Sequence, residues 1–255
     1  MSGTRVLQVR DAYKRFGAVT ALGGVSLDVE AGEVLALLGD NGAGKSTLIK
    51  AISGVHRLDS GRITLDGIDI TDANAMTVRA HGIETVYQDL ALFDNLAPVA
   101  NFYAGREVAG PVWLPRALRL LRHQRMADRT HELLNRLQIT IPDFDAPVAL
   151  MSGGQRQAVA VARAVAFSSK VVILDEPTAA LGLRESARVL DLVRRLKSDG
   201  VAVILISHSM DHVMAVADRA IVLRRGRAVG ETTPTAENHE QLVSWIVGAT
   251  GGLAV

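Results

Sequence analysis

Eight consecutive residues near the start of the chain have the types and the order of a phosphate-binding loop, G-x-x-x-x-G-K-[ST]. They are Gly39, Asp40, Asn41, Gly42, Ala43, Gly44, Lys45 and Ser46. Glycines let a backbone fold around a phosphate group, so that successive N–H groups point inward. The lysine adds a cation for the β- and γ-phosphates of a nucleotide, and the serine hydroxyl is a ligand for Mg²⁺. The next residue, Thr47, is placed to donate to an α-phosphate.

The surroundings of this loop favour phosphate binding over a glycine-rich turn that holds nothing. Residues Val34–Leu38 form an apolar run typical of a buried parallel strand, and residues 45–53 have the composition of a helix. A strand, a glycine loop and a helix start together bring the positive end of the helix dipole to the phosphate.

A second apolar run, residues 171–174, ends in the two acids Asp175 and Glu176. Enzymes with a phosphate loop use an acid on a neighbouring strand to hold Mg²⁺, usually through water, and Asp175 fits that role. Glu176 lies one residue further, where a carboxylate could polarise an attacking water. Alone, the pair is equally well explained as a solvated strand end. The phosphate loop in the same chain favours the functional interpretation.

A second helix start also has the composition of an anion site. Ser152, Gly153, Gly154 and Gln155 precede residues 156–167, which predict a helix. Ser152 and Gln155 have capping-box spacing, which is the simpler explanation. However, each glycine in a helix costs roughly 1 kcal/mol, so capping alone does not explain two of them. Exposed backbone N–H groups at a helix start suit a phosphate, although spacing alone leaves open whether both sites meet on one nucleotide.

The predicted elements that position these residues alternate between strands and helices. Buried strands are expected at residues 171–174, 201–206 and 220–223, with an amphipathic helix at 185–197. This alternation indicates an α/β fold with a mainly parallel sheet covered on both faces. Residues 116–137 combine helical periodicity with many arginines, and predict a helical insert between two sheet-forming halves.

Size and composition narrow the possible functions. The 255 residues suffice for one sizeable α/β domain with a smaller subdomain. The absence of cysteine excludes disulfides, zinc–thiolate sites and a cysteine nucleophile, and the net charge of +1 does not favour nucleic acid as a partner. No apolar run reaches the roughly 18 residues of a membrane span, and the N-terminus lacks a signal-peptide pattern. We therefore expect a cytoplasmic protein that reaches a membrane only through a partner.

Together the motifs resemble those of the ABC ATPases, over nearly the whole chain. The resemblance rests on Ser152 to Gln155 between the phosphate loop and the strand ending in Asp175 and Glu176. Phe16, Gln88 and His208 match three further family elements in the expected order. As single residues they have simpler explanations in packing or surface loops. The ordered set implies that Phe16 stacks on adenine, Gln88 senses Mg²⁺ and the membrane partner, and His208 contacts the γ-phosphate.

The resemblance implies a P-loop NTPase core with a mainly parallel sheet, an N-terminal antiparallel β subdomain and an inserted α-helical subdomain. It predicts a single domain over residues 1–255, with the core and β subdomain at 1–87 and 156–230, the helical subdomain at about 88–155, and a C-terminal helix and tail at 231–255. Two such domains would pack head to tail as a homodimer. Each ATP, with its Mg²⁺ held by Ser46, Gln88 and Asp175, would lie between the phosphate loop of one copy and Ser152 to Gln155 of the other. Lys45, Glu176 as general base and His208 would carry the hydrolysis.

Residues 87–96, Asn101 and residues 104–107 resemble the ATPases of monosaccharide importers for ribose, xylose and fructose. This implies work at the cytoplasmic face of the cell membrane, with integral membrane permease subunits and a periplasmic or extracellular solute-binding protein as partners, and no nucleic acid. An importer of another solute, such as amino acids, is the main alternative. A non-transport ABC ATPase acting on ribosomes or DNA, and a P-loop kinase, are the others.

Two positions depart from the family pattern. Met151 replaces the usual leucine, a change that conserves volume and has a small expected cost. Gly182 stands where most members have an aspartate that helps to couple the two sites. The usual coupling is therefore not assumed here.

Overall fold

A six-stranded sheet forms the centre of the protein, with the strand order β12-β11-β3-β10-β9-β6. We describe a computed structural model, which places residues 4–110, 113, 120–137, 139–141, 143–167, 169–179 and 181–248. The strands of this sheet are β3 (Val34–Leu38), β6 (Ile83–Val86), β9 (Val171–Asp175), β10 (Ala202–Ile206), β11 (Arg219–Arg224) and β12 (Arg227–Thr232). All neighbours pair in parallel except β11 and β12, which form an antiparallel hairpin. The predicted α/β fold with a mainly parallel sheet is confirmed.

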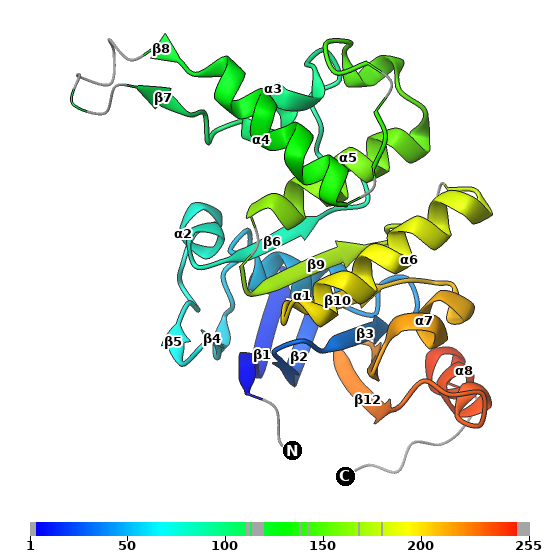
Figure 1. The fold of residues 1–255 in the computed structure, drawn as a ribbon. Helices are drawn as coiled ribbons and strands as arrows, with labels where there is room; N and C mark the ends of the chain where they lie inside the picture. Colours follow the sequence, from blue (N-terminus) through cyan, green and yellow to red (C-terminus); the bar gives the residue numbers. More distant parts are fainter. Residues whose placement is uncertain are drawn as a thin grey trace.

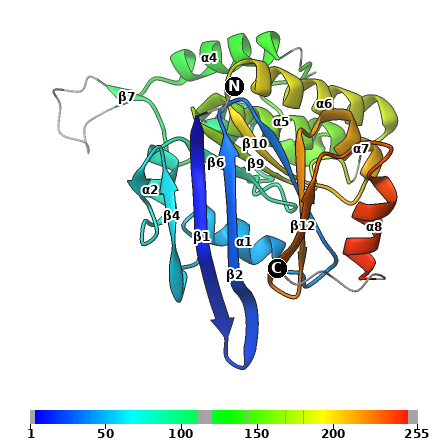
Figure 2. The same cartoon turned by 90° about the horizontal axis from the view of Figure 1, so that it is seen from below.

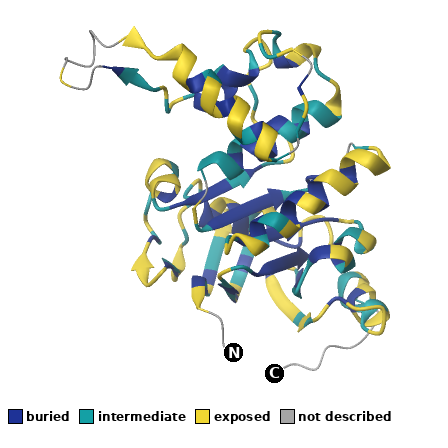
Figure 3. Ribbon diagram, in the orientation of Figure 1, coloured by how far each residue is buried: buried dark blue, intermediate teal, exposed yellow. Residues whose placement is uncertain are grey.

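Alternate residues of the central strands face two different layers. Leu35 and Leu37 of β3 pack toward helix α1 (Lys45–Ile52) and the N-terminal sheet. Val34 of the same strand faces the helices α5 (Gly153–Phe167) and α6 (Leu183–Ser198). Because both faces are covered, β3, β9 and β10 consist of apolar runs, and Figure 3 shows the central strands buried. Asp175, the last residue of β9, is the first polar residue after this strand's apolar run.

A second, antiparallel sheet covers α1, with the order β2-β1-β4-β5. Its strands are β1 (Arg5–Phe16), β2 (Val19–Glu30), β4 (Ser60–Leu65) and β5 (Ile68–Asp69), followed by helix α2 (Ala75–Ala80). Figure 2 shows β1 and β2 as a long hairpin with β4 beside it. The predicted N-terminal antiparallel sheet is confirmed.

A helical part stands at one end of the central sheet (Figure 1). It consists of α3 (Pro98–Tyr103), α4 (His123–Arg136), a short turn of helix at Val148–Leu150 and most of α5. Phe102, Met126 and Leu134 form its core with Val159 of α5. Neighbouring residues of α5 pack on the central sheet instead. This helix therefore belongs to both layers, and the predicted domain boundaries stay a prediction.

The expected helix over residues 116–137 is wrong in its first part. Leu120–Leu121 form strand β8, which pairs with β7 (Ala109–Gly110), and α4 begins only at His123. The N–H of Arg122 donates to the carbonyl of Val108 at 2.8 Å. The hairpin thus continues as far as Arg122, the residue directly before α4. This tertiary pairing overrides the helical periodicity. Residues 116–119 lie outside the described part of the chain.

Two further helices complete the fold, α7 (Met210–Val216) and α8 (His239–Val247). Leu242 of α8 is fully buried in a cluster with Leu38 of β3 and Val222 of β11. Among the described helices, none combines the length and the apolar character that a bilayer span requires.

Candidate functional site

The predicted site residues of the sheet gather at one edge because four parallel strands end there. Strand pairing places Val86 of β6 opposite Leu174 of β9, Leu174 opposite Leu205 of β10, and Leu205 opposite Ala36 of β3. The segments that follow carry Gln88, then Asp175 and Glu176, then His208, and finally the phosphate loop. Ligands in open α/β sheets bind at this carboxyl edge.

The phosphate loop arches between β3 and α1 and is wedged against neighbouring backbone. A Cβ atom on Gly39 would lie 2.2 Å from the carbonyl oxygen of Leu223, and one on Gly44 2.7 Å from that of Ala21. Both glycines have positive φ angles, 140° and 108°. A Cβ atom on Gly42, where φ is 78°, would have no such neighbour within 4 Å. Gly39 and Gly44 are therefore required by the fold, whereas Gly42 leaves space for a ligand.

Lys45 is folded back over this loop. Its Nζ donates to the carbonyl of Gly39 at 2.6 Å and to that of Asp40 at 3.1 Å. Burial lowers the pKa of the ammonium group, and the carboxylates of Glu176 and Asp175 oppose that shift. A buried ammonium that shares carbonyls with its own loop is suited to exchange them for phosphate oxygens.

The rest of the loop leads directly into α1. Asp40, Asn41 and Ser46 are exposed, Thr47 is half-buried and Ala43 is buried. The first-turn N–H groups of a helix have no acceptor within the helix, so Ser46 and Thr47 offer donors to an anion. The structure thus brings all nine predicted residues into one loop and one helix turn.

Asp175 and Glu176 lie at the end of β9, where burial raises the pKa of each carboxyl group. Lys45 opposes the shift at Asp175, and His208 opposes it at Glu176. Glu176 adopts a φ of 52°, in the left-handed region that is costly for a side chain of this kind. Its N–H donates to the carbonyl of Ile206 at 3.0 Å, which ties this turn to β10.

His208 faces Glu176 across the edge of the sheet. Its Nε2 lies 3.3 Å from Oε1 of Glu176, and its backbone N–H donates to Oε2 at 3.4 Å. Oε1 is buried and has no hydrogen-bond partner of good geometry among the described residues. A buried acceptor of this kind suits a water molecule or a ligand group that donates to it. Glu176 and His208, which the sequence analysis proposed for separate roles, therefore lie in contact in the structure.

Ser152 to Gln155 begin α5 with a complete capping box. The N–H of Ser152 donates to Oε1 of Gln155 at 2.9 Å, and the N–H of Gln155 donates to Oγ of Ser152 at 3.3 Å. A Cβ on Gly154 would lie 2.9 Å from Cγ of Glu185 in α6, so packing accounts for this glycine. Ser152 and Gly153 are exposed. The capping explanation is thus present, and nucleotide binding by these residues stays a prediction.

Phe16 lies at the end of a strand of the N-terminal sheet, whereas Gln88 follows β6 of the central sheet. Phe16 ends β1 with 46% of its surface exposed, and the ring of His56 meets it edge-on at 5.3 Å. An exposed aromatic face of this kind can stack on a planar base. Gln88 is exposed two residues after β6, and the preceding Tyr87 hydroxyl lies 2.9 Å from Oγ of Ser53 at the end of α1.

Asn101 holds the loop that follows Gln88 in shape. The N–H of Phe93 donates to its Oδ1 at 2.7 Å, and its Nδ2 donates to the carbonyls of Phe93 and Leu96 at 3.1 and 3.0 Å. The side chain is fully buried. In the sequence, only the family resemblance pointed to this residue. The pairing of Thr178 with His212, at 3.0 Å, had no sequence signal at all.

The residues present fit Mg²⁺ in company with a nucleotide. No group of three or more metal-binding His, Asp or Glu side chains occurs within the ranges that the structure places. Asp175 and the Ser46 hydroxyl are hard oxygen donors of the kind that Mg²⁺ prefers, and this ion commonly takes the remaining ligands from water and phosphates. The orphaned Oε1 of Glu176 supports a polar occupant beside them.

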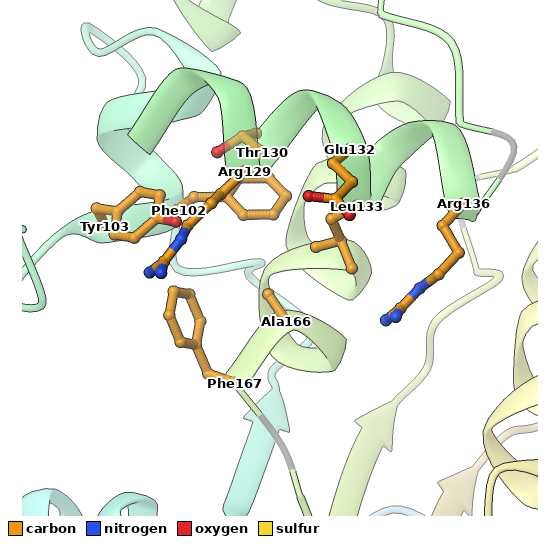
Figure 4. A pocket seen from close by; sticks show the side chains of 9 residues that line it. All are labelled: Phe102, Tyr103, Arg129, Thr130, Glu132, Leu133, Arg136, Ala166 and Phe167. Carbon is orange, nitrogen blue, oxygen red and sulfur yellow. The ribbon is translucent and has the colours of Figure 1, made fainter. Parts of the chain in front are cut away.

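Two hollows lie away from this edge. One of about 300 Å³ is enclosed by α3, α4 and the end of α5, and Figure 4 shows Tyr103, Arg129 and Phe167 pointing into it. The guanidinium of Arg106 lies 4.6 Å from the centre of the Phe167 ring and pairs with Glu84 of β6. The other, of about 430 Å³, separates the start of α5 from α6.

Comparison with known proteins places the chain among transport ATPases. The sequence model of the family described as ABC transporter matches residues 22–179. The chain is 46% identical to a xylose/arabinose import ATP-binding protein of Sulfolobus acidocaldarius, over 95% of this chain and 96% of that protein. It is 45% identical to a fructose import ATP-binding protein of Rhizobium meliloti, over 98% and 96%. A ribose import ATP-binding protein of Rubrobacter xylanophilus is 41% identical, and the chain spans 47% of its length.

Solved structures agree on the fold. A nucleotide-free ATP-binding cassette from an ABC transporter superposes with a TM-score of 0.81 at 26% identity, over 97% of this chain and all of that one. A dimeric cassette bound to ADP and phosphate gives a TM-score of 0.76 at 22% identity, over 90% of this chain and 99% of that one.

Proposed function

This chain belongs to the ABC transporter family, and we propose that it binds and hydrolyses ATP to energise a membrane importer of monosaccharides. The observation that carries the proposal is the meeting of the Lys45 loop, Asp175, Glu176 and His208 at one edge of the sheet. The names of the relatives at 45–46% identity, which concern pentose and fructose import, support the solute class.

In the proposed reaction, the side chains of this edge divide the work between binding and proton transfer. Lys45 releases its loop carbonyls and binds the β- and γ-phosphates, while the N–H groups of the α1 start bind the phosphate oxygens. Glu176 accepts a hydrogen bond from the attacking water and takes up its proton. The ring of His208, on the other side of that carboxylate, donates toward the γ-phosphate. Phe16 stacks on the adenine.

Ser46 and Asp175, with Gln88 at the rim, would hold Mg²⁺ beside the phosphates. When bound, the ion neutralises charge on the β- and γ-phosphates. The buried position of Asp175 favours this role, because a cation offsets the burial of its charge.

Two copies would complete the nucleotide sites. The exposed Ser152 and Gly153 of each copy would lie against the phosphate loop of the other.

We further propose that integral membrane permease subunits hold the dimer at the cytoplasmic face of the membrane, together with an external solute-binding protein. The hollow of Figure 4 is our candidate for the permease contact. Its wall residue Phe167 is linked through Arg106 to Glu84 of β6, the strand that leads to Gln88. A displacement of Phe167 by the permease would reach the segment of Gln88 through Arg106 and Glu84.

The Glu176→Gln variant tests the base and the dimer together. We expect it to bind Mg-ATP, to hydrolyse it at least about 100-fold more slowly, and to accumulate as a dimer. Light scattering with and without Mg-ATP should show the 27.2 kDa chain doubling in mass. Glu240→Gln, an exposed acid in α8, is the matched control. Near-normal turnover would refute the role of Glu176, and a monomer that holds ATP would refute pairing without permease subunits.

A further inference from the structure

A second pair of side chains lies next to the contact of Glu176 with His208. Oγ1 of Thr178 and Nδ1 of His212 are 3.0 Å apart, and the tautomer of the ring decides which of them donates. Thr178 is buried and His212 is half-buried in the first turn of α7. Thr178 lies two positions after Glu176, and His212 lies four positions after His208. The two contacts are therefore successive links between the same two segments.

The segment that carries Glu176 needs such support because its backbone is strained. A non-glycine residue in the left-handed region costs on the order of 1–3 kcal/mol and persists only where its surroundings hold it. On one side, β9 and the bond from the Glu176 N–H to Ile206 hold the turn. On the other side, the buried Thr178 hydroxyl and His212 fasten it to α7.

The same link also orients His208. Ser209 caps α7 by accepting a hydrogen bond from the N–H of His212 at 3.4 Å. His208 comes directly before this cap, two positions before the helix begins. The side chain of His208 is 60% exposed, and a ring with that freedom is positioned mainly by the backbone that carries it. Fixing His212 fixes the first turn of α7, and with it the direction in which His208 leaves the backbone.

We propose that His212 is a positioning residue for hydrolysis, which acts through Thr178 to hold Glu176 and His208 in their reactive arrangement. The inference rests on the proposed ATPase activity. His212 does not touch the nucleotide in this scheme. Its loss should therefore slow turnover without weakening ATP binding, because the phosphate loop lies on other elements.

The test uses side chains that imitate one ring nitrogen at a time. Asparagine places a polar atom near the position of Nδ1, whereas glutamine places one near Nε2. We expect His212→Ala, His212→Gln and Thr178→Val each to lower kcat roughly fivefold, with KM for ATP unchanged within about twofold. His212→Asn and Thr178→Ser should stay within about twofold of the native kcat. The double variant Thr178→Val with His212→Ala should be no slower than either single one.

Steady-state ATPase kinetics on the full chain measure these effects, and thermal unfolding shows that each variant is folded. His123→Ala, an exposed histidine at the start of α4, is the matched control. The inference is overturned if His212→Asn is as slow as His212→Ala, or if KM rather than kcat changes. A native chain that binds ATP without hydrolysing it would instead contradict the proposed function.

Discussion

At the scale of single residues, the site holds one buried cation between two partly buried acids. Burial shifts the pKa of Lys45 down and those of Asp175 and Glu176 up, so every one of these groups is pushed toward its neutral form. Their mutual attraction offsets only part of that cost. Such an arrangement is less stable than an apolar one but ready for a charged ligand.

Removing the charge of Asp175 should therefore stabilise the protein in the absence of ligand. Above the raised pKa, the carboxylate is ionised in both the folded and the unfolded chain, and the full burial cost applies. As the pH falls through that pKa, the folded state takes up a proton, and below the ordinary pKa the cost is gone. We expect Asp175→Asn to raise Tm at pH 7 by roughly 2–4 °C, and less as the pH falls.

Thermal unfolding without nucleotide or Mg²⁺ measures this difference, with Asp89→Asn, an exposed acid, as control. With Mg-ATP present, the native chain should have the higher Tm, because only its Asp175 carboxylate binds the ion. A lower Tm for Asp175→Asn without ligand would mean that its attraction to Lys45 outweighs burial.

Single residues also show how far sequence reasoning reaches. The phosphate loop, Asp175 and Glu176 could be predicted from residue types and spacing, because their chemistry needs a local order. Phe16, Gln88 and His208 are single side chains on separate elements, and only the family resemblance singled them out. His212 could not be found, because its role comes from a contact with Thr178, 34 residues away.

At the scale of elements, apolar runs predicted the buried strands well, whereas the start of α4 depends on a strand pairing that the helical period does not reveal. Leu120 and Leu121 fit a helical period, yet they pair with β7. The start of α6 raises a similar question, because its N-cap is Gly182 and no side chain caps it. A Cβ on Gly182 would lie 2.8 Å from Oε2 of Glu185. Glu185 thus occupies the place that an acidic residue at position 182 would take.

Because the two positions share this space, Gly182→Asp should change stability in opposite directions in two backgrounds. In the native chain it brings two carboxylates together and should cost roughly 1 kcal/mol of the free energy of unfolding. In Glu185→Ala, the aspartate becomes an N-cap acceptor and should gain a few tenths of a kcal/mol. Urea unfolding of the four proteins gives both values, with Gly182→Asn as the uncharged comparison. Equal effects in both backgrounds would show that Glu185 does not fill this place.

At the scale of the whole molecule, the two glycine-containing helix starts belong to different layers. The phosphate loop follows a strand of the central sheet, whereas Ser152 to Gln155 begin a helix that helps to form the helical part. A head-to-tail pair would join them across two chains, and each chain would then supply the phosphate loop of one site and the Ser152 to Gln155 segment of the other.

Mixing two inactive variants tests this arrangement directly. Lys45→Met disables the phosphate loop. Gly153→Asp adds a carboxylate, which is favourable at a helix N-terminus but repels a phosphate group. If sites are shared, a dimer of one chain of each kind has one wholly native site. An equal mixture contains half such dimers, so ATPase activity should return to about a quarter of the native value. Mixing Lys45→Met with the double variant is the control, since no native site can form. Recovery in neither mixture would contradict a nucleotide site that is shared between two chains.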